Sequence, residues 1–330
     1  MTRVVVTGSA GHLGEALLRT FSELPGYETV GIDILASEFT TNQASITDSD
    51  AVLDLVAGAD AVLHTATLHK PHVATHSRQD FVDVNISGTL NLLEAARQHR
   101  VPRFVFTSTT STFGHAMRPA ADAPAVWIDE TVRPQPRNIY GVTKVSAEDL
   151  CELFHKRFQM PVMVLKTSRF FPEEDDNAAT RAAFDDANIK AIEYLYRRVE
   201  LADVVSAHQC AMQAAEQVGF GRFIVSSTSP FDQADLALLN QDAAAVLRAR
   251  LPEAVAGFAR LGWRLPERID RVYDNTAARQ TLGWEPQFDF RSILDAHLQG
   301  TQVGSALSQR IGSRGYHEEK FIDGPFPVEE

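Results

Sequence analysis

The feature that most constrains this chain is the run VVVTGSAGHLG at residues 4–14. A short β-branched run, Arg3–Thr7, comes directly before its three glycines. After the glycines, apolar residues recur at helical spacing, and a second strand-like run, Thr29–Asp33, follows. The stretch therefore predicts a strand, a glycine-rich turn, a helix and a second strand, which is a βαβ unit.

The same alternation continues along the first two thirds of the chain. Further strands and helices are predicted at Ala61–Thr65, Val84–His99, Phe104–Ser108, Tyr140–Phe158 and Val162–Lys166. Strands that alternate with helices indicate an α/β fold with a Rossmann-type, doubly wound parallel sheet. We expect an NAD-binding domain over 1–168, to which 198–228 returns, and a smaller C-terminal substrate-binding lobe formed by 169–197 and 229–330.

The three glycines have a chemical interpretation in this context. Gly8 follows a strand, Gly14 opens a helix, and Asp33 ends the next strand 19 residues later. That arrangement lets the backbone approach a pyrophosphate at a helix N-terminus and places a carboxylate near ribose hydroxyls. An ordinary βα turn is the alternative. Because Asp33 would repel a 2′-phosphate, and no arginine directly follows it, NAD is favoured over NADP.

Composition excludes several other classes of protein. The chain has 31 Lys and Arg against 43 Asp and Glu, a formal net charge of -12, and no basic stripe, so nucleic acid is not expected as a partner. Its two cysteines, Cys151 and Cys210, both fall in helix-like segments, which disfavours a disulfide framework. The sequence shows neither a signal-peptide pattern nor a membrane-length apolar run, so we expect a cytoplasmic protein.

A second constellation lies at NIYGVTK, residues 138–144. Tyr140 and Lys144 are four residues apart on a predicted helix, so both side chains share one face. An ammonium beside a phenol favours the phenolate and lowers its pKa, which would let the pair exchange a proton with an alcohol. A surface pair is the alternative, but FVFTSTTSTFG, residues 104–114, places hydroxyl groups at the carboxyl edge of the sheet.

Taken together, these segments resemble the extended short-chain dehydrogenase/reductase superfamily, in its NAD-dependent epimerase/dehydratase branch. The resemblance rests on TGSAGHLG at 7–14, Asp33, HTAT at 64–67, VNISGT at 84–89, residues 107–114, YGVTK at 140–144, residues 198–208 and DNTAARQTLGWEP at 274–286. It implies Tyr140 as general acid/base, Lys144 as the residue that lowers the tyrosine pKa and holds the nicotinamide ribose, and Thr109 as the group that polarises the substrate oxygen. Ser108 or Ser111 could serve instead of Thr109 if the loop is shifted.

The resemblance also implies the remaining site residues. The cofactor would contact Gly8, Ala10, Gly11, His12, Leu13, Gly14, Asp33, Ile46, Thr65, Ala66, Thr67, Asn85, Thr107, Tyr140 and Lys144. The substrate would contact Thr109, Thr110, Ser111, His69 and Arg169. It further implies a homodimer formed by the helices near 84–99 and 140–158, where Leu92, Leu93, Leu150, Leu153 and Phe154 exceed what one face of a sheet should absorb.

Arg169 is where the chain departs most from similar proteins. Nucleotide-sugar members usually carry an asparagine there, and the segment between Arg169 and Arg198 is short for a uridine diphosphate. The region is similar to that of enzymes that oxidise free uronic acids, in which an arginine grips a carboxylate. The alternative is an ion pair with the acidic loop, through Glu173, Glu174, Asp175 or Asp176.

A histidine-rich loop follows the strand at Ala61–Thr65. His69, His72 and His76 lie close together in sequence, with His64 just before them. Pro71 interrupts the helix that would align them, and no acidic or cysteine ligand accompanies them, so we expect polar contacts to the substrate rather than a metal.

The sequence therefore predicts an NAD-dependent oxidoreductase that moves a hydride at a secondary hydroxyl or ketone carbon of a sugar-like or other small polar substrate. A nucleotide-sugar (UDP-hexose) 4-epimerase is the first alternative. A non-catalytic NAD-sensing module is the second, and the intact Tyr140, Lys144 and Thr109 argue against it.

Overall fold

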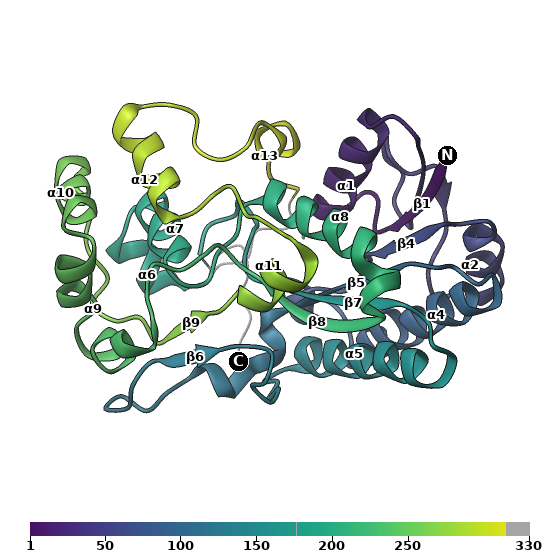
Figure 1. Ribbon diagram of the computed structural model, residues 1–330, viewed down its shortest axis with the longest axis horizontal. Helices are drawn as coiled ribbons and strands as arrows, with labels where there is room; N and C mark the ends of the chain where they lie inside the picture. Colours follow the sequence, from purple (N-terminus) through teal and green to yellow (C-terminus); the bar gives the residue numbers. More distant parts are fainter. Residues whose placement is uncertain (176, 315–330) are drawn as a thin grey trace.

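The computed structural model describes residues 1–175 and 177–314 and is built around a seven-stranded sheet in which neighbouring strands are parallel (Figure 1). The strand order is β3-β2-β1-β4-β5-β7-β8. The strands are β1 (Thr2–Thr7), β2 (Tyr27–Asp33), β3 (Asn42–Gln43), β4 (Ala61–His64), β5 (Phe104–Thr109), β7 (Val162–Thr167) and β8 (Phe220–Val225). The order reverses direction at β1 and β4, which confirms the predicted doubly wound α/β fold.

Helices cover both faces of this sheet because successive strand residues point to opposite sides. Along β1, Val4 and Val6 belong to one apolar core and Val5 to the other. The first core lies under α1 (His12–Glu23), α8 (Leu201–Val218), α11 (Thr276–Leu282) and α13 (Ala306–Ile311). The second lies under α2 (Ser49–Val56), α4 (Gly88–Gln98) and α5 (Ile139–Phe158), with α3 (Arg78–Val82) and a π-helical segment, Asp83–Ser87, leading into α4.

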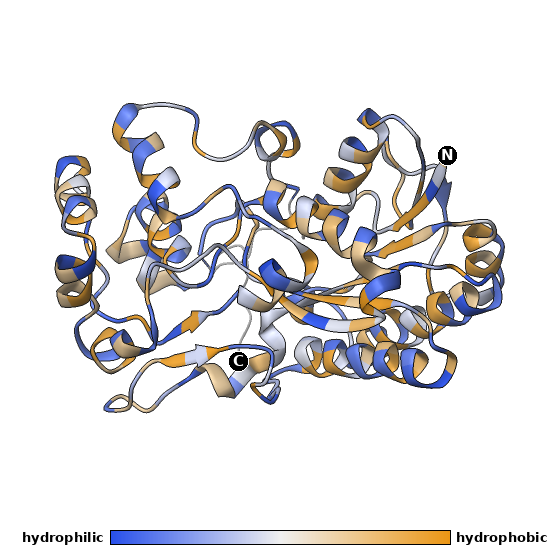
Figure 2. Cartoon of the chain, in the orientation of Figure 1, coloured by the Kyte–Doolittle hydropathy of each residue, from blue (hydrophilic) through white to orange (hydrophobic). Residues whose placement is uncertain are grey.

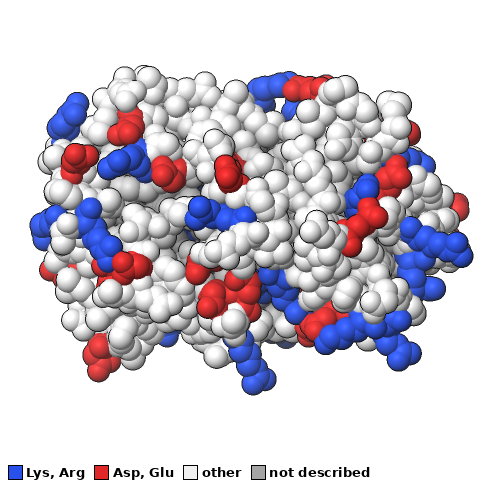
Figure 3. Space-filling view, in the orientation of Figure 1, with Lys and Arg blue, Asp and Glu red and all other residues white. Residues whose placement is uncertain are grey.

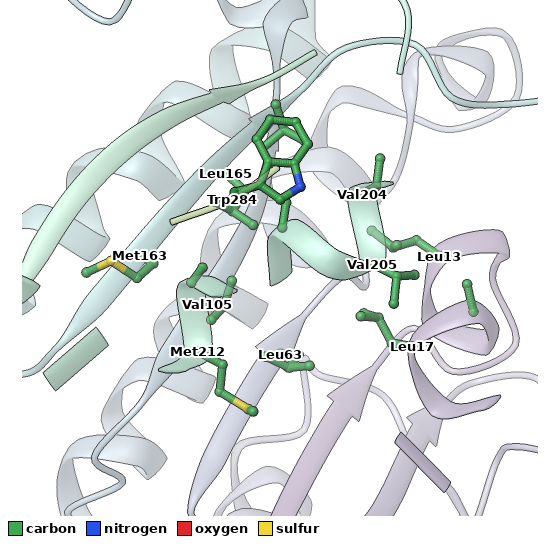
Figure 4. Packing of buried hydrophobic residues seen from close by; sticks show 14 of the residues in the cluster. Leu13, Leu17, Leu63, Val105, Met163, Leu165, Val204, Val205, Met212 and Trp284 are labelled. Carbon is green, nitrogen blue, oxygen red and sulfur yellow. The ribbon is translucent and has the colours of Figure 1, made fainter. Parts of the chain in front are cut away.

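Figure 4 shows the packing of the first core. Leu13 and Leu17 from α1 and Val204 from α8 face the strand side chains Leu63 and Val105. Figure 2 shows the same division along the chain, with apolar residues concentrated on the central strands and mixed polarity on the surrounding helices. The strands are thus buried on both sides, and only their ends are available for a ligand.

A second lobe lies beside the carboxyl ends of these strands and has its own apolar core. It is formed by β6 (Val126–Ile128), which pairs in parallel with β9 (Arg271–Tyr273), and by α6 (Ala178–Ala183), α7 (Asp186–Tyr194), α9 (Leu236–Arg250), α10 (Pro252–Leu261) and α12 (Phe290–Gln299). Short 3₁₀ helices occur at η1 (Lys70–Ala74), η3 (Thr110–Met117) and η4 (Gln233–Asp235).

Three elements, β6, α11 and α13, pack with a different lobe from the one predicted from their place in the sequence. Strand β6 falls within 1–168 in sequence but pairs with β9 of the second lobe. Helices α11 and α13 fall within 229–330 but pack on α8 and α1, where Trp284 and Ile311 join the first core. Burial of Trp284 and Ile311 against the large sheet stabilises α11 and α13 in this position. Residues 315–330 of the predicted lobe lie outside the described residues.

The apolar residues from which a dimer was expected are mostly buried within this chain. Leu92, Leu93 and Phe154 belong to the core under α4 and α5, so the sheet absorbs them. Leu153 is 48% exposed. On the same two helices, Leu90, Val142 and Phe158 are also exposed, at 37%, 45% and 49%. The outer surface of α4 and α5 therefore carries apolar residues, but largely different ones from those predicted.

Three further properties of the described residues bear on the sequence-based expectations. None of the helices described within 1–175 and 177–314 combines the length and apolar character needed to cross a membrane. Cys151 in α5 and Cys210 in α8 are free thiols. Figure 3 shows Lys and Arg interspersed with Asp and Glu on the displayed face.

Candidate active site

The glycine-rich turn is held together by close backbone contacts. Gly8 has a φ of +76° and donates from its N–H to the Ile32 carbonyl at 2.8 Å. A Cβ at Gly14 would lie 1.9 Å from the Gly8 carbonyl oxygen, and one at Gly8 would lie 2.8 Å from the Ala66 nitrogen. Glycine is therefore required at both positions, and the turn presents the first N–H groups of α1 to the space beyond the sheet.

Asp33 stands beside this turn at the end of β2. Its Oδ2 accepts from the Ala10 N–H at 3.0 Å, and its Oδ1 accepts from the Leu35 N–H at 2.9 Å. These two bonds fix the carboxylate in the cavity wall. A glycine cradle at a helix N-terminus with an oriented carboxylate at the next strand fits a dinucleotide with a free 2′-hydroxyl.

The turn opens into a cavity of about 1500 Å³ at the carboxyl edge of the sheet. Most of the predicted cofactor residues line it, namely Gly8, Ala10, Gly11, His12, Leu13, Gly14, Asp33, Ile46, Thr65, Ala66, Thr67, Thr107 and Tyr140. All five predicted substrate residues line it as well: Thr109, Thr110, Ser111, His69 and Arg169. The fold thus brings residues from β1, β2, β4, β5 and α5 to one place.

Asn85 and Lys144 are not among the residues that line this cavity. Asn85 is buried, and its amide bonds to Thr67, to both backbone groups of Leu68 and to Thr143 at 2.8–3.1 Å. It joins the loop after β4 to α5, and its amide oxygen and nitrogen each make two hydrogen bonds within the chain. The sequence pattern could not show that the Asn85 amide is used inside the fold.

Tyr140 and Thr109 meet on the cavity wall. Thr109 ends β5, and Tyr140 lies in the first turn of α5, whose N-cap residue Asn138 accepts from the Gly141 N–H at 3.0 Å. Burial raises the pKa of Tyr140 to about 12, and a hydrogen bond with Thr109 opposes that shift. The phenol is therefore protonated at neutral pH in this structure. Desolvation thus raises the Tyr140 pKa, opposite to the lowering that the Tyr140 and Lys144 spacing predicted.

Lys144 lies one helical turn beyond Tyr140 and is almost fully buried. Its Nζ donates to the Thr107 carbonyl at 2.6 Å and sits 4.0 Å from the centre of the Phe106 ring. Burial lowers the pKa of Lys144 to about 7, against the attraction of the Glu148 carboxylate. The ammonium is thus close to its titration point at physiological pH, and it is anchored at the strand end next to Thr109.

The two alternative serines do not take the place of Thr109. Ser108 Oγ donates to Glu148 Oε1 at 2.5 Å, on the opposite side of β5, and Lys166 completes that buried pair at 2.7 Å. Ser111 lines the cavity, but its N–H donates to Thr109 Oγ1 at 3.1 Å, which orients the threonine hydroxyl. Strand alternation therefore selects Thr109 as the hydroxyl that faces Tyr140.

The histidines near β4 occupy different environments. His64 is buried between the hydroxyls of Thr7 and Thr89, at 2.8 and 3.0 Å. The ring of His69 is stacked against Tyr140, with centroids 6.0 Å apart and an interplanar angle of 16°. Burial first, and then His72 and Lys144, lower the pKa of His69 to about 3, so it is a neutral imidazole in the cavity wall.

His72 accepts the His69 N–H on its Nδ1 at 2.8 Å, and the His76 Nδ1 is hydrogen-bonded with the Thr75 hydroxyl at 2.9 Å. Within residues 1–175 and 177–314, no three His, Cys, Asp or Glu side chains are arranged so that they could hold a metal ion.

Arg169 lies at the cavity, but its guanidinium contacts the loop that follows it. Its Nη2 donates to the carbonyls of Glu173 and Glu174 at 3.3 and 2.7 Å, and Nη1 lies 3.8 Å from Asp175 Oδ2. On its other side, Nε lies 3.8 Å from Glu193 Oε2. These contacts favour the acidic-loop alternative over a carboxylate-gripping role. Asp176 lies outside the described residues.

The far end of the cavity was missed by the sequence analysis. It extends into the second lobe and is lined there by Arg118, Arg137, Arg197, Arg264, Arg268 and Arg271. Arg197 pairs with Asp175 at 2.9 Å and with Glu193 at 2.8 Å. The expected short pocket is therefore not what the structure shows. Arg264, Arg268 and Arg271 are close in sequence, but the other three come from distant segments, so no sequence pattern could have grouped all six.

The chain belongs to the NAD-dependent epimerase/dehydratase family, whose sequence model matches residues 4–225. The family is part of the extended short-chain dehydrogenase/reductase superfamily, which confirms the resemblance inferred from the motifs and the class of an NAD(P)-dependent dehydrogenase or epimerase.

Two curated relatives show the extent of the similarity. The chain is 34% identical over 180 residues to an L-arabinose 1-dehydrogenase (NAD(P)(+)) from Haloferax volcanii, a match that covers 50% of this chain and 66% of the relative. It is 28% identical over 207 residues to a uronate dehydrogenase from Agrobacterium fabrum, covering 60% of this chain and 72% of the relative.

Solved structures extend the likeness to the second lobe. A mutated uronate dehydrogenase superposes with a TM-score of 0.61 at 22% identity, covering 92% of this chain and 87% of the other. A UDP-glucuronic acid 4-epimerase from Bacillus cereus, in complex with NAD, gives 0.61 at 20% identity, covering 90% and 98%. At these identities the likeness shows a shared fold.

Proposed function

We propose that this chain catalyses NAD-dependent hydride transfer at a secondary hydroxyl or ketone carbon of a sugar or sugar acid. The observation that carries the proposal is the contact of Tyr140 with Thr109 on the wall of a cavity that begins at the glycine cradle. Relatives named as an arabinose dehydrogenase and a uronate dehydrogenase support a free sugar or sugar acid as the substrate class.

The position of each residue indicates its role in the proposed reaction. Thr109, oriented by the Ser111 N–H, donates a hydrogen bond to the substrate oxygen. As the phenolate, Tyr140 accepts the hydroxyl proton when the C–H bond breaks; as the phenol, it returns a proton in the reverse direction. NAD supplies the hydride acceptor when bound. Lys144, buried one turn beyond, favours the phenolate when it is charged, and the family resemblance assigns it the nicotinamide ribose as well.

A substrate screen tests the proposal. Purified protein with NAD is offered free sugars, uronic acids and nucleotide sugars, and NADH formation and product identity are followed. Oxidation of a free sugar or uronic acid supports the proposal. NAD binding with no turnover in any class would indicate the NAD-sensing alternative.

The cofactor preference is a separate prediction. Because Asp33 is fixed by two backbone N–H groups, it cannot turn away from a 2′-phosphate. NAD should bind at least about tenfold more tightly than NADP, and Asp33→Asn should narrow that gap. Calorimetric titration of both cofactors measures it, and equal affinities in the wild type would contradict the prediction.

One observation favours the second candidate, a nucleotide-sugar 4-epimerase. The cavity continues past Arg169 to several arginines of the second lobe, among them Arg264 and Arg271, which suit a diphosphate. Turnover of a UDP-hexose without net NADH formation, together with inactivity on free sugars, would select this candidate.

We further propose a homodimer formed through α4 and α5. Leu90, Val142, Leu153 and Phe158 give this surface exposed apolar residues that a second copy would cover. Sedimentation should show a species of twice 36.4 kDa at micromolar concentration. Val142→Glu should shift the equilibrium toward the monomer. A wild-type protein that sediments only as a monomer would exclude the dimer.

The free thiols of Cys151 and Cys210 suit a reducing, cytoplasmic compartment.

A further inference from the structure

His12 is buried without the partners that a buried imidazole normally has. It is the first residue of α1 and only 6% exposed. Among the described residues, neither Nδ1 nor Nε2 of its ring has a hydrogen-bond partner. Other buried histidines of this chain are satisfied: His64 by two hydroxyls, and His208 by the Val204 carbonyl and Thr107. Unpartnered buried polar groups are costly, so the His12 ring calls for an explanation.

Aromatic and charged side chains surround the His12 ring, and none of the described residues hydrogen-bonds to it. Phe170 and Phe171 pack against it, with ring centroids 6.1 and 5.8 Å away. These rings offer no hydrogen-bond acceptor. His12 itself lies in the cavity wall between Gly11 and Leu13, which belong to the glycine cradle. Glu173 and Glu200 act on the ring through their charge, but neither hydrogen-bonds to it. The cavity at the N-terminus of α1 is the side from which a bound ligand reaches the imidazole.

We propose that the His12 side chain donates a hydrogen bond to a phosphate oxygen of the bound dinucleotide diphosphate, in addition to the backbone cradle. The inference rests on the NAD binding proposed above. The helix N-terminus favours an anion at this point, and an imidazole offers an N–H donor in either tautomer. This hydrogen bond exists only in the complex, because the ring nitrogen loses its partner when the cofactor dissociates. His12 therefore contributes to cofactor binding as well as to packing.

The proposal has a consequence for pH. In the free protein, burial lowers the pKa of His12 to about 4; Glu173 and Glu200 act to raise it, and Arg314 and Arg198 act to lower it. His69 faces the same space as a neutral ring. A bound diphosphate favours the imidazolium, so the complex holds more protons than the free protein. Affinity for the diphosphate should therefore rise as the pH falls.

Two variants and two ligands test this. ADP-ribose carries the diphosphate, and adenosine lacks it, so calorimetric titration of both separates the His12 contact from the adenine site. His12→Phe should weaken ADP-ribose binding about three- to tenfold at about pH 8 and leave adenosine binding unchanged. His12→Gln keeps an N–H donor and should lose less. Between about pH 8 and about pH 5.5, affinity for ADP-ribose should rise more in the wild type than in either variant, because Lys144 titrates in all three proteins.

His297→Phe is the matched control, because His297 packs edge-on against Trp263 in the second lobe, away from the cavity, and burial lowers its pKa too. It should bind ADP-ribose like the wild type at every pH. The proposal is overturned if folded His12→Phe binds ADP-ribose as tightly as the wild type, or if only its KM for substrate changes. A wild-type protein that binds neither ADP-ribose nor NAD would instead refute the proposed function itself.

Discussion

The two ends of the cavity are built in different ways. The cofactor end is made from backbone within one βαβ unit, where Gly14 could not carry even a methyl group. The substrate end is made from long side chains, and Arg197 and Arg268 there are already engaged, the first with Asp175 and Glu193 and the second with Asn240. A rigid backbone cradle tolerates little change, whereas paired side chains can exchange partners when a ligand arrives. The chemistry lies between the two ends, at Tyr140.

The largest effect is expected from Tyr140→Phe, which removes the proton acceptor and leaves the ring. Turnover of whichever substrate the screen identifies should fall by about 10²–10⁴-fold, because a positioned acid/base contributes that much. NAD affinity should stay within about twofold, since the cradle is untouched.

Tyr273→Phe is the matched control at the far end, where the hydroxyl contacts the Met117 sulfur at 3.0 Å. The hydroxyl also accepts from Arg271 Nε at 3.3 Å. Turnover should stay within about threefold, because neither contact reaches the Tyr140 end of the cavity. Comparable losses in both variants would show that the chemistry is not confined to the Tyr140 end.

The next largest effect is expected from the difference in packing between the glycine cradle and helix α10 of the second lobe. Gly14→Ala should lower the free energy of unfolding by about 3 kcal/mol and abolish measurable NAD binding, because the new Cβ meets a backbone oxygen that cannot yield. Gly257→Ala in α10 places its Cβ 3.0 Å from the end of the Leu298 side chain, which can turn aside. Its stability should change by less than about 1 kcal/mol. Chemical denaturation of both variants measures the difference in their free energies of unfolding. Equal losses in the two variants would show that the cradle can relax around the added methyl group.

The smallest effect is expected at Arg169, where the two ends of the cavity meet. Arg169→Lys loses the fork that holds the carbonyls of Glu173 and Glu174, so the free energy of unfolding should fall by about 1 kcal/mol. KM should stay within about threefold if the loop is its main partner. A tenfold rise in KM at unchanged stability would instead restore the hypothesis that this arginine grips a substrate carboxylate.

The fold was predictable to the level of its sheet because strand and helix periods are local properties. The strands around Arg3–Thr7 and Val162–Lys166 and the helix near 140–158 fall within one or two residues of the observed elements. The lobe that β6, α11 and α13 each join was not predictable, because it depends on which core buries the apolar face of the element. For the same reason, Leu92 and Leu93 were misjudged as surface residues.

Within the site, the sequence by itself determined the elements that depend on neighbouring residues: the glycine cradle, Asp33 after the second strand, and Tyr140 four residues before Lys144. Only the tertiary structure decided that Ser108 is engaged by Glu148, that the Asn85 amide is hydrogen-bonded inside the fold, that burial raises the Tyr140 pKa, and that His12 has two unpartnered nitrogens among the described residues. The physical reason is that spacing along the chain fixes which face a residue occupies. Desolvation and hydrogen-bond satisfaction depend on what distant segments bring to that face.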